Sequence, residues 1–175
     1  MPGPEQLTAA LAAEIAECVR RFGARPPGAG PPPLAAGPVP ERPSAGHAPA
    51  SVRAVGVDVV DVPRLARLGR RWGDSLLAHL FTEEERRAAQ GGSDRYRWES
   101  LGGRLAAKEA VKKVLGSQGE AAAWRDLEIL KGRHGQPVLA LHNGAAVAVE
   151  HAGCTHVHLS ITHEAQLAVA VAVGV

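Results

Sequence analysis

The stretch "GRLAAKEAVKKVLG", residues 103–116, has the composition of an amphipathic helix that we expect to run over about residues 99–115. Ala, Leu, Lys and Glu favour helix, and Gly116 is a natural end for it. At about 100° per residue, six apolar side chains gather on one broad face. These are Ala106, Ala107, Ala110, Val111, Val114 and Leu115. The segment is therefore expected to lie on a hydrophobic core.

The charged residues of this helix allow two interpretations. Arg104, Lys108 and Lys112 form one stripe along the border of the apolar face, and Glu109 stands beside the stripe. The stripe could be a solvated surface on which a Glu109–Lys113 pair contributes roughly a few tenths of a kcal/mol. Alternatively, the cations bind phosphate groups and the carboxylate holds a divalent metal. The helix by itself favours the solvated surface, and Lys113 is expected to be exposed in either case.

The segments around the helix alternate between strand and helix patterns. We expect a strand over 52–62, helices after Pro63 and Thr82, a hairpin over 126–141, a helix capped by Asn143, and two final strands joined by "HEAQ" at 163–166. Asp61, near the end of the first strand, is expected to cap the helix that follows, and Thr82 and Glu85 have the spacing of a capping box. Hairpins and helices are interleaved without repeated strand–helix–strand crossovers. The predicted fold class is α+β, a single small antiparallel-sheet domain packed with helices.

The chain divides in composition near residue 51. Residues 4–23 have the apolar spacing of an amphipathic helix, whereas residues 24–50 are rich in Pro, Gly and Ala and contain almost no large apolar side chains. Such a linker cannot bury enough surface to offset its ordering entropy. We therefore predict a helix and flexible linker over 1–50 and a folded domain over 51–175.

Composition excludes several classes of protein. A net charge of +2 and only 3% aromatic residues over 175 residues argue against nucleic acid as a partner. The longest apolar run is far shorter than the ~20 residues needed to cross a bilayer, so we expect no membrane association. Cys18 and Cys154 form neither a metal motif nor a disulfide framework. These features predict a cytoplasmic protein.

Two residues outside the central helix carry possible chemistry. Asp58 interrupts an apolar strand and points to the same side as Gly56. It could face water on an edge strand, or it could be one of the one or two carboxylates with which Mg²⁺ is usually bound. His163 is expected at the turn of the final hairpin. His156 and His158 share a strand face, but two histidines without a third ligand do not favour a zinc site.

Five segments, taken in order, resemble one enzyme family. They are "GVDVVDVPRL" (56–65), "FTEEE" (81–85), "GRLAAKEAVKKVLG" (103–116), "HGQPVLAL" (134–141) and "HVHLSITHE" (156–164). Together they resemble the holo-[acyl carrier protein] synthases, the small 4′-phosphopantetheinyl transferases, over about residues 54–173. The resemblance implies the fold of that family. Gln136 departs from the family's pattern, which has Lys in this turn, so a cationic contact is either missing or supplied by Arg133 or His134.

The resemblance also implies roles for individual residues. Asp58 and Glu109 correspond to the Mg²⁺ ligands. The implied contacts with coenzyme A are Arg104, Lys108 and Lys112, which bind its phosphates, and His163. The implied catalytic residues are Asp58, Glu109 and Lys112, and the implied docking site for an acyl carrier protein consists of Arg64, Arg67 and Arg71. Glu109 and a metal-bound water remain alternatives for the general base. The meaning of the Glu85 match stays open, since a capping box already explains it.

The implied reaction is the Mg²⁺-dependent transfer of 4′-phosphopantetheine from coenzyme A to a serine of an acyl carrier protein, releasing adenosine 3′,5′-bisphosphate. Members of the small type assemble as homotrimers with active sites between subunits, so a homotrimer is expected. Two alternatives are another Mg²⁺-dependent enzyme that hydrolyses nucleotide pyrophosphates and a non-catalytic coenzyme A-binding or scaffold domain. The sequence does not distinguish carrier proteins of fatty acid, polyketide and peptide synthesis.

Overall fold

The computed structural model describes residues 51–91 and 95–175. The helix predicted over 4–23 and the linker predicted over 24–50 lie outside the described residues. Both stay predictions, as does the domain boundary near residue 51.

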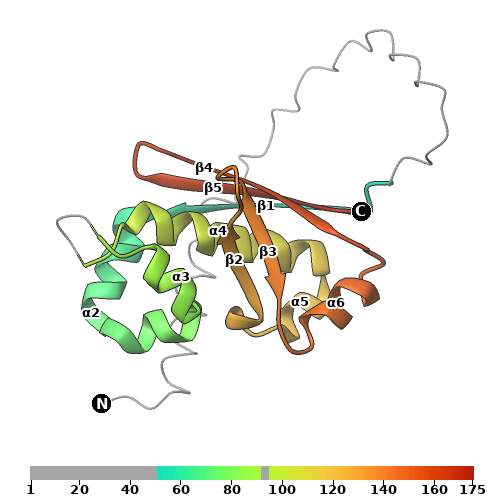
Figure 1. Cartoon of the computed structure of the whole chain (residues 1–175), viewed down its shortest axis with the longest axis horizontal. Coiled ribbons are helices and arrows are strands. Elements are labelled where there is room, and N and C mark those ends of the chain that lie inside the picture. Colours follow the sequence, from blue (N-terminus) through green and yellow to red (C-terminus); the bar gives the residue numbers. More distant parts are fainter. Residues whose placement is uncertain (1–50, 92–94) are drawn as a thin grey trace, which may run out of the picture. The chain divides into compact units, whose positions relative to one another are not determined.

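The described residues form two antiparallel sheets and a set of helices (Figure 1). In chain order the elements are β1 (Ala54–Asp61), α2 (Val62–Leu80), α3 (Glu83–Ala88), α4 (Trp98–Leu115), α5 (Ser117–Ala121), the 3₁₀-helix η1 (Trp124–Asp126), β2 (Leu127–Lys131), β3 (Pro137–Leu141), α6 (Ala145–His151), β4 (Val157–Glu164) and β5 (Leu167–Gly174). One sheet has the order β1–β5–β4, and β2 pairs with β3 in a hairpin. The predicted α+β class is confirmed.

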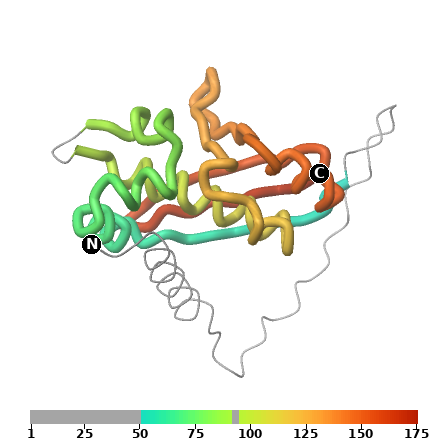
Figure 2. Tube along the Cα trace, turned by 90° about the horizontal axis from the view of Figure 1, so that it is seen from below, coloured from blue at the N-terminus to red at the C-terminus, as the bar shows by residue number. Residues whose placement is uncertain are grey.

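Small side chains allow α4 to lie close against the inner face of the three-stranded sheet. Ala168, Ala170 and Ala172 of β5 alternate inward and are fully buried. On β1, a Cβ added to Gly56 would lie 2.0 Å from the carbonyl oxygen of Ala110. Since real atoms never approach so closely, only glycine at this position permits the observed contact between β1 and α4. Figure 2 shows α4 running along the strands of this sheet.

The apolar face predicted for the central helix is buried as expected. All six of its residues, Ala106, Ala107, Ala110, Val111, Val114 and Leu115, belong to one hydrophobic core. Leu127 and Ile129 of β2 and Val149 of α6 belong to the same core. Helix α4 is therefore the element on which the sheet, the β2–β3 hairpin and α6 all pack.

The other face of the three-stranded sheet carries two rows of valine. Register places Val55 opposite Val173, Val57 opposite Val171 and Val59 opposite Val169. The three valines of β1 are 45–57% exposed. We call these six residues the outer valine face. This face is apolar surface that is partly exposed in the single chain, and burying it against another surface would be energetically favourable.

Local signals at two helix starts were predicted correctly. Asp61 ends β1 and its Oδ1 accepts a hydrogen bond of 2.8 Å from the Arg64 backbone N–H, which caps α2. Thr82 and Glu85 form the expected capping box at α3.

The prediction that Asn143 caps a helix is wrong. The N-cap of α6 is Gly144, and Asn143 adopts a positive φ of 49° while its amide donates to Asp126 Oδ1. Asn tolerates this left-handed conformation because its short polar side chain forms local hydrogen bonds. The sequence also gave no sign of α5, which begins directly after the Gly116 turn.

No helix in the described ranges 51–91 and 95–175 is long and apolar enough to cross a membrane. Cys154 is a buried free thiol.

Candidate functional site

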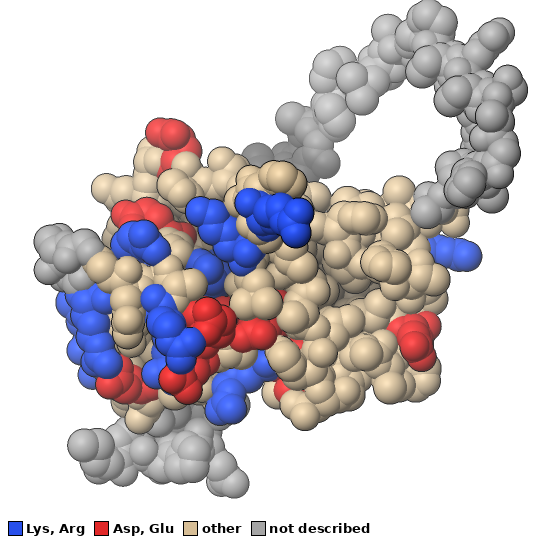
Figure 3. Space-filling view, viewed as in Figure 1, with Lys and Arg blue, Asp and Glu red and all other residues tan. Residues whose placement is uncertain are grey.

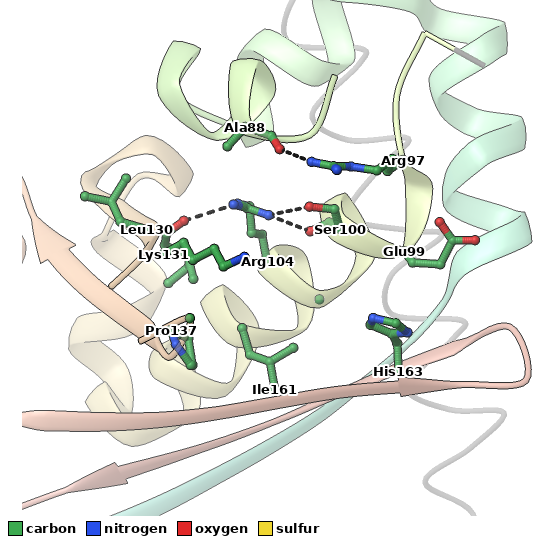
Figure 4. A pocket seen from close by; sticks show the side chains of 13 residues that line it. Ala88, Arg97, Glu99, Ser100, Arg104, Leu130, Lys131, Pro137, Ile161 and His163 are labelled. Atoms are coloured by element: carbon green, nitrogen blue, oxygen red, sulfur yellow. Dashed lines mark hydrogen bonds between the residues drawn. The ribbon is translucent and has the colours of Figure 1, made fainter. Parts of the chain in front are cut away.

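A pocket of about 530 Å³ opens between α4, the β2–β3 hairpin and β4 (Figure 4). Three basic side chains from different parts of the chain line it: Arg97, Arg104 and Lys131. His163 and Ser100 also line it. The structure thus brings together two of the residues implied for coenzyme A, Arg104 and His163, although 58 positions separate them along the chain. A concave site with several cations suits an anionic ligand.

The guanidinium of Arg104 is held in a defined orientation. Its Nε donates to the Ile129 carbonyl at 3.2 Å, and its Nη1 donates to the carbonyl and hydroxyl oxygens of Ser100 at 3.1 and 2.6 Å. Burial lowers the pKa of Arg104, and the negative charge of Glu85 opposes that shift. Because arginine remains charged even so, the pocket keeps a fixed positive charge on its wall.

His163 lies on β4 and not at the hairpin turn, which corrects its predicted position. The turn is formed by Ala165 and Gln166, both with positive φ, at 45° and 75°. His163 pairs with Ala168 and therefore lies on the inner face of the sheet. Figure 4 shows its ring at the pocket, across from Arg104.

Asp58 and Glu109 form a second group, which we call the carboxylate pair. Asp58 lies on the inner face of β1, with its side chain largely buried against α4. Burial raises the pKa of Glu109, and the nearby charge of Asp58 raises it further. Burial also raises the pKa of Asp58, against the opposing effect of Lys113. Two partly buried carboxylates that repel each other fit a divalent cation, which would relieve both effects.

No group of three or more His, Cys, Asp or Glu side chains within residues 51–91 and 95–175 is placed to hold a metal ion. A cation at the carboxylate pair would therefore take its other ligands from water or from a bound phosphate, as Mg²⁺ commonly does.

Lys113 is exposed as expected, with 45% of its side chain accessible, but it also contacts the carboxylate pair. Its Nζ donates to Asp58 Oδ1 at 2.8 Å and to the Val57 carbonyl at 2.6 Å. The close packing at Gly56 explains this reach, because it brings the Cβ of Lys113 next to β1. Lys113 therefore forms an ion pair with Asp58 that connects α4 to β1, and not the Glu109–Lys113 pair within the helix that was considered from the sequence.

Lys112 lies beside the same group. Its ammonium is 4.3 Å from the centre of the Trp124 ring, a cation–π contact. Burial lowers the pKa of Lys112, whereas the charges of Glu109 and Glu120 raise it. Its position next to Glu109 is compatible with the implied role toward phosphate.

Lys108 corrects the idea of a single phosphate-binding stripe. Its side chain is 0% exposed. Its Nζ donates to Glu85 Oε2 at 2.6 Å, to the Leu80 carbonyl at 2.8 Å and to the Trp124 carbonyl at 2.9 Å. All three donors of the ammonium are engaged inside the protein. Lys108 is therefore an internal cross-link and does not face the pocket.

The pocket and the carboxylate pair lie on different sides of α4. Arg104 and Glu109 are separated by about 140° around the helix axis, and neither Asp58 nor Glu109 lines the pocket. One helix thus presents Arg104 and Glu109 in different directions.

The arginines implied in docking lie on α2. Arg67 and Arg71 are exposed and Arg64 is half-buried in the first turn of the helix. Figure 3 shows that the charged side chains on this face of the molecule gather over α2, α3 and the hairpin, whereas the surface over α5 and α6 carries few. The structure places these arginines on one helix, where a partner could meet them.

Sequence reasoning missed Lys131 of the pocket and left the role of Glu85 open. Lys131 closes β2 just before the turn that contains Gln136. The Gln136 Oε1 accepts from the His134 N–H at 2.9 Å, so its side chain braces the turn. Lys131 lines this pocket, whereas Arg133 and His134, the two alternatives considered for a cationic contact, do not. Its place at the end of a strand beside a motif turn was the available signal.

Comparison with known proteins gives the family of the chain. The sequence profile of the 4′-phosphopantetheinyl transferase superfamily matches residues 54–172. The chain belongs to this superfamily. The resemblance drawn from the motifs is therefore confirmed, and with it the enzyme class.

The match to named relatives of this transferase superfamily member extends over almost the whole length of each relative. Holo-[acyl-carrier-protein] synthase of Desulforudis audaxviator is 42% identical over 121 residues, which are 69% of this chain and 91% of the relative. The Frankia casuarinae protein of the same name is 43% identical over 125 residues, 71% of this chain and 98% of the relative. A Bacillus anthracis holo-(acyl-carrier-protein) synthase, solved in complex with CoA (3′,5′-ADP), is 28% identical, with a TM-score of 0.55 over 70% of this chain and 96% of that one.

Proposed function

We propose that this chain transfers the 4′-phosphopantetheine group from coenzyme A to a serine of an acyl carrier protein and releases adenosine 3′,5′-bisphosphate. The observation that carries the proposal is the placement of α4, which presents Arg104 to a cation-lined pocket and Glu109 to the carboxylate pair. The chain belongs to the 4′-phosphopantetheinyl transferase superfamily, and two relatives over 40% identical are named holo-[acyl-carrier-protein] synthase.

Each half of the site has a separate task in this proposal. The pocket with Arg104, Lys131 and His163 binds phosphate groups of coenzyme A. The carboxylate pair, Asp58 and Glu109, holds Mg²⁺. A cation at this position would offset the charge of the pyrophosphate as the serine oxygen approaches.

Lysine side chains complete the electrostatics near the carboxylate pair. Lys112 stands next to Glu109, where its charge would stabilise the leaving group. Lys113 reaches Asp58 directly. Lys108 is omitted from phosphate binding because its ammonium is fully engaged in the interior.

We also propose that the active chain is a homotrimer with its sites between subunits, which the resemblance implied. Two observations support assembly. The pocket and the carboxylate pair face different sides of α4, so one copy could provide one half of a complete site and its neighbour the other. The outer valine face offers the apolar surface that such an interface needs.

Docking of the carrier protein is assigned to Arg64, Arg67 and Arg71 of α2. Carrier proteins are acidic, and a basic surface raises the rate of encounter with an acidic partner. A cytoplasmic location agrees with the free thiol of Cys154.

The reaction is tested by following product from coenzyme A with and without apo-acyl carrier protein in the presence of Mg²⁺. We expect adenosine 3′,5′-bisphosphate to form only when the carrier is present, and to stop forming once all carrier is modified. Free phosphopantetheine formed without carrier would instead indicate the pyrophosphate hydrolase considered from the sequence. If no product forms under either condition, the remaining interpretation is the non-catalytic coenzyme A-binding or scaffold domain.

A further inference from the structure

Glu85 is a fully buried carboxylate to which the proposed reaction gives no role. Its Oε2 accepts from the Thr82 backbone N–H at 2.8 Å and from Lys108 Nζ at 2.6 Å. Its Oε1 accepts from the Ile129 backbone N–H at 2.9 Å. A capping box requires only the contact with Thr82, so two of these three bonds need another explanation.

The Ile129 residue connects Glu85 to the pocket. Its backbone N–H donates to Glu85, and its carbonyl oxygen accepts from Arg104 Nε at 3.2 Å. Ser100 holds the other side of the guanidinium through Nη1. Arg104 is therefore fixed between its own helix and β2, and the position of β2 at this point is set by Glu85.

Lys108 makes this arrangement electrostatically possible. A buried carboxylate without a partner would be strongly unfavourable, and the Lys108 ammonium neutralises it. Glu85 pairs with Lys108, whereas the guanidinium of Arg104 is bonded to the uncharged oxygens of Ile129 and Ser100. The same ammonium binds the Leu80 and Trp124 carbonyls and so fixes α4 against the end of α2 and against η1.

We infer that Glu85 is a positioning residue for Arg104: through Ile129 it holds the guanidinium toward an anionic group bound in the pocket. The inference rests on the proposed function for the identity of that anion, a phosphate of coenzyme A. The orientation of Arg104 itself requires no ligand.

The first test observes Arg104 directly in the full chain without ligand. The side-chain Nε–H signal of Arg104 in ¹H–¹⁵N spectra is assigned by its loss in Arg104→Lys. In Glu85→Gln the side chain has only one acceptor oxygen, so it cannot accept hydrogen bonds from both the Ile129 N–H and the Lys108 ammonium in their present positions. We expect the Arg104 Nε–H signal to move toward those of exposed arginines and to exchange faster with water.

Thr82→Ala is the matched control. It removes the hydroxyl that caps α3 and that donates to Glu128 of β2, but it removes no partner of the Glu85–Ile129 and Ile129–Arg104 hydrogen bonds. This variant should lower the melting temperature without moving the Arg104 signal. An unchanged Arg104 signal in folded Glu85→Gln would overturn the inference. An equal shift in both variants would also overturn it, since the shift would then follow from the contacts of Thr82 and not from the bond between Glu85 and Ile129.

The second test measures coupling with coenzyme A as the probe. By calorimetry, Glu85→Gln should weaken coenzyme A binding about tenfold, the scale of a hydrogen bond to a charged group. In an Arg104→Met background the same change should have almost no further effect, because the two residues act through one contact. Full additivity of the two losses would contradict the inference.

Two further outcomes are a Glu85→Gln variant that does not fold and an unmodified chain that does not bind coenzyme A. If Glu85→Gln does not fold, Glu85→Asp is used: it keeps the charge beside Lys108 but shortens the side chain, so the Ile129 contact is lost and the same coupled result is expected. If the unmodified chain does not bind coenzyme A, the proposed function fails, and the ligand-free Arg104 signal still decides whether Glu85 positions the guanidinium.

Discussion

Lys113 Nζ lies 2.8 Å from Asp58 Oδ1, and this contact joins the central helix to the first strand at the carboxylate pair. It exists because Gly56 allows α4 to approach β1. A lysine that the sequence pattern assigned to the solvent thus lies within bonding distance of an implied metal ligand. Any cation that binds Asp58 meets a neighbouring positive charge.

Lys113→Met should therefore increase the affinity of the ligand-free protein for a divalent cation. Even when screened as in bulk water, a like charge at ~4 Å costs about 1 kcal/mol, which is about fivefold in affinity. Titration with Mn²⁺, followed by electron paramagnetic resonance, measures the effect. Lys131→Met is the control, since that lysine lines the separate pocket. Weaker Mn²⁺ binding in Lys113→Met would show that Lys113 does not compete with the cation.

Arg64→Glu should raise the KM for the acyl carrier protein several-fold and leave the KM for coenzyme A nearly unchanged. The reason is that α2 lies outside the pocket, and a reversed charge there repels an acidic partner. Steady-state kinetics with each substrate varied in turn measure both constants. Arg125→Glu, an exposed change in η1, is the matched control. An equal rise of both constants would argue against docking on α2.

Val57→Lys should convert a trimer into monomers without unfolding the chain. Val57 lies in the middle of the outer valine face and is 48% exposed in the single chain, so the new charge disturbs only an interface that covers this face. Light scattering coupled to size exclusion gives the mass of each species. Val138→Lys places the same charge on β3, outside the face, and should keep the trimer. A trimer that survives Val57→Lys would place the interface elsewhere.

The lowered pKa of Glu128 predicts that the folded protein loses stability in acid. Burial favours a raised pKa, but hydrogen bonds from Thr82 and His142 and the charge of Lys108 outweigh it, so the pKa of Glu128 lies below its ordinary value of 4.5. A carboxylate with a lowered pKa stabilises the fold fully above the ordinary value and loses that contribution as the pH falls below it. Glu128→Gln should therefore show a flatter loss of unfolding free energy below pH 4.5.

Chemical denaturation at a series of pH values measures this slope, with the exposed Glu150→Gln as control. The control should follow the unmodified protein. Identical slopes for the protein and Glu128→Gln would mean that Glu128 is not stabilised in the folded state.

Local rules predicted most of the described fold. Alternating valines and alanines identified β1 and β5, the apolar spacing identified the buried face of α4, and short-range caps at Asp61 and Thr82 identified two helix starts. Such signals act within a few residues, so the sequence contains them directly. Asn143 failed because its partner, Asp126, is distant along the chain.

The site was predictable in its residue types but not in its geometry. Lys108 and Lys112 are equivalent by helical spacing, yet Lys108 is buried against Glu85 whereas Lys112 contacts Trp124. The difference arises because α3 and η1 pack over one turn of α4, and periodicity does not contain that packing. Lys113 is exposed as predicted, but its bond to Asp58 was missed for the same reason, since Asp58 comes from β1.

The most direct test of the proposed reaction is the intact mass of an apo-acyl carrier protein after incubation with the full chain, coenzyme A and Mg²⁺. We expect the serine of the carrier to gain one phosphopantetheine group. The gain should disappear with Glu109→Ala, although that variant keeps its melting temperature because loss of Glu109 removes repulsion from Asp58. An unmodified carrier with the native chain, or equal modification by Glu109→Ala, would contradict the proposed reaction.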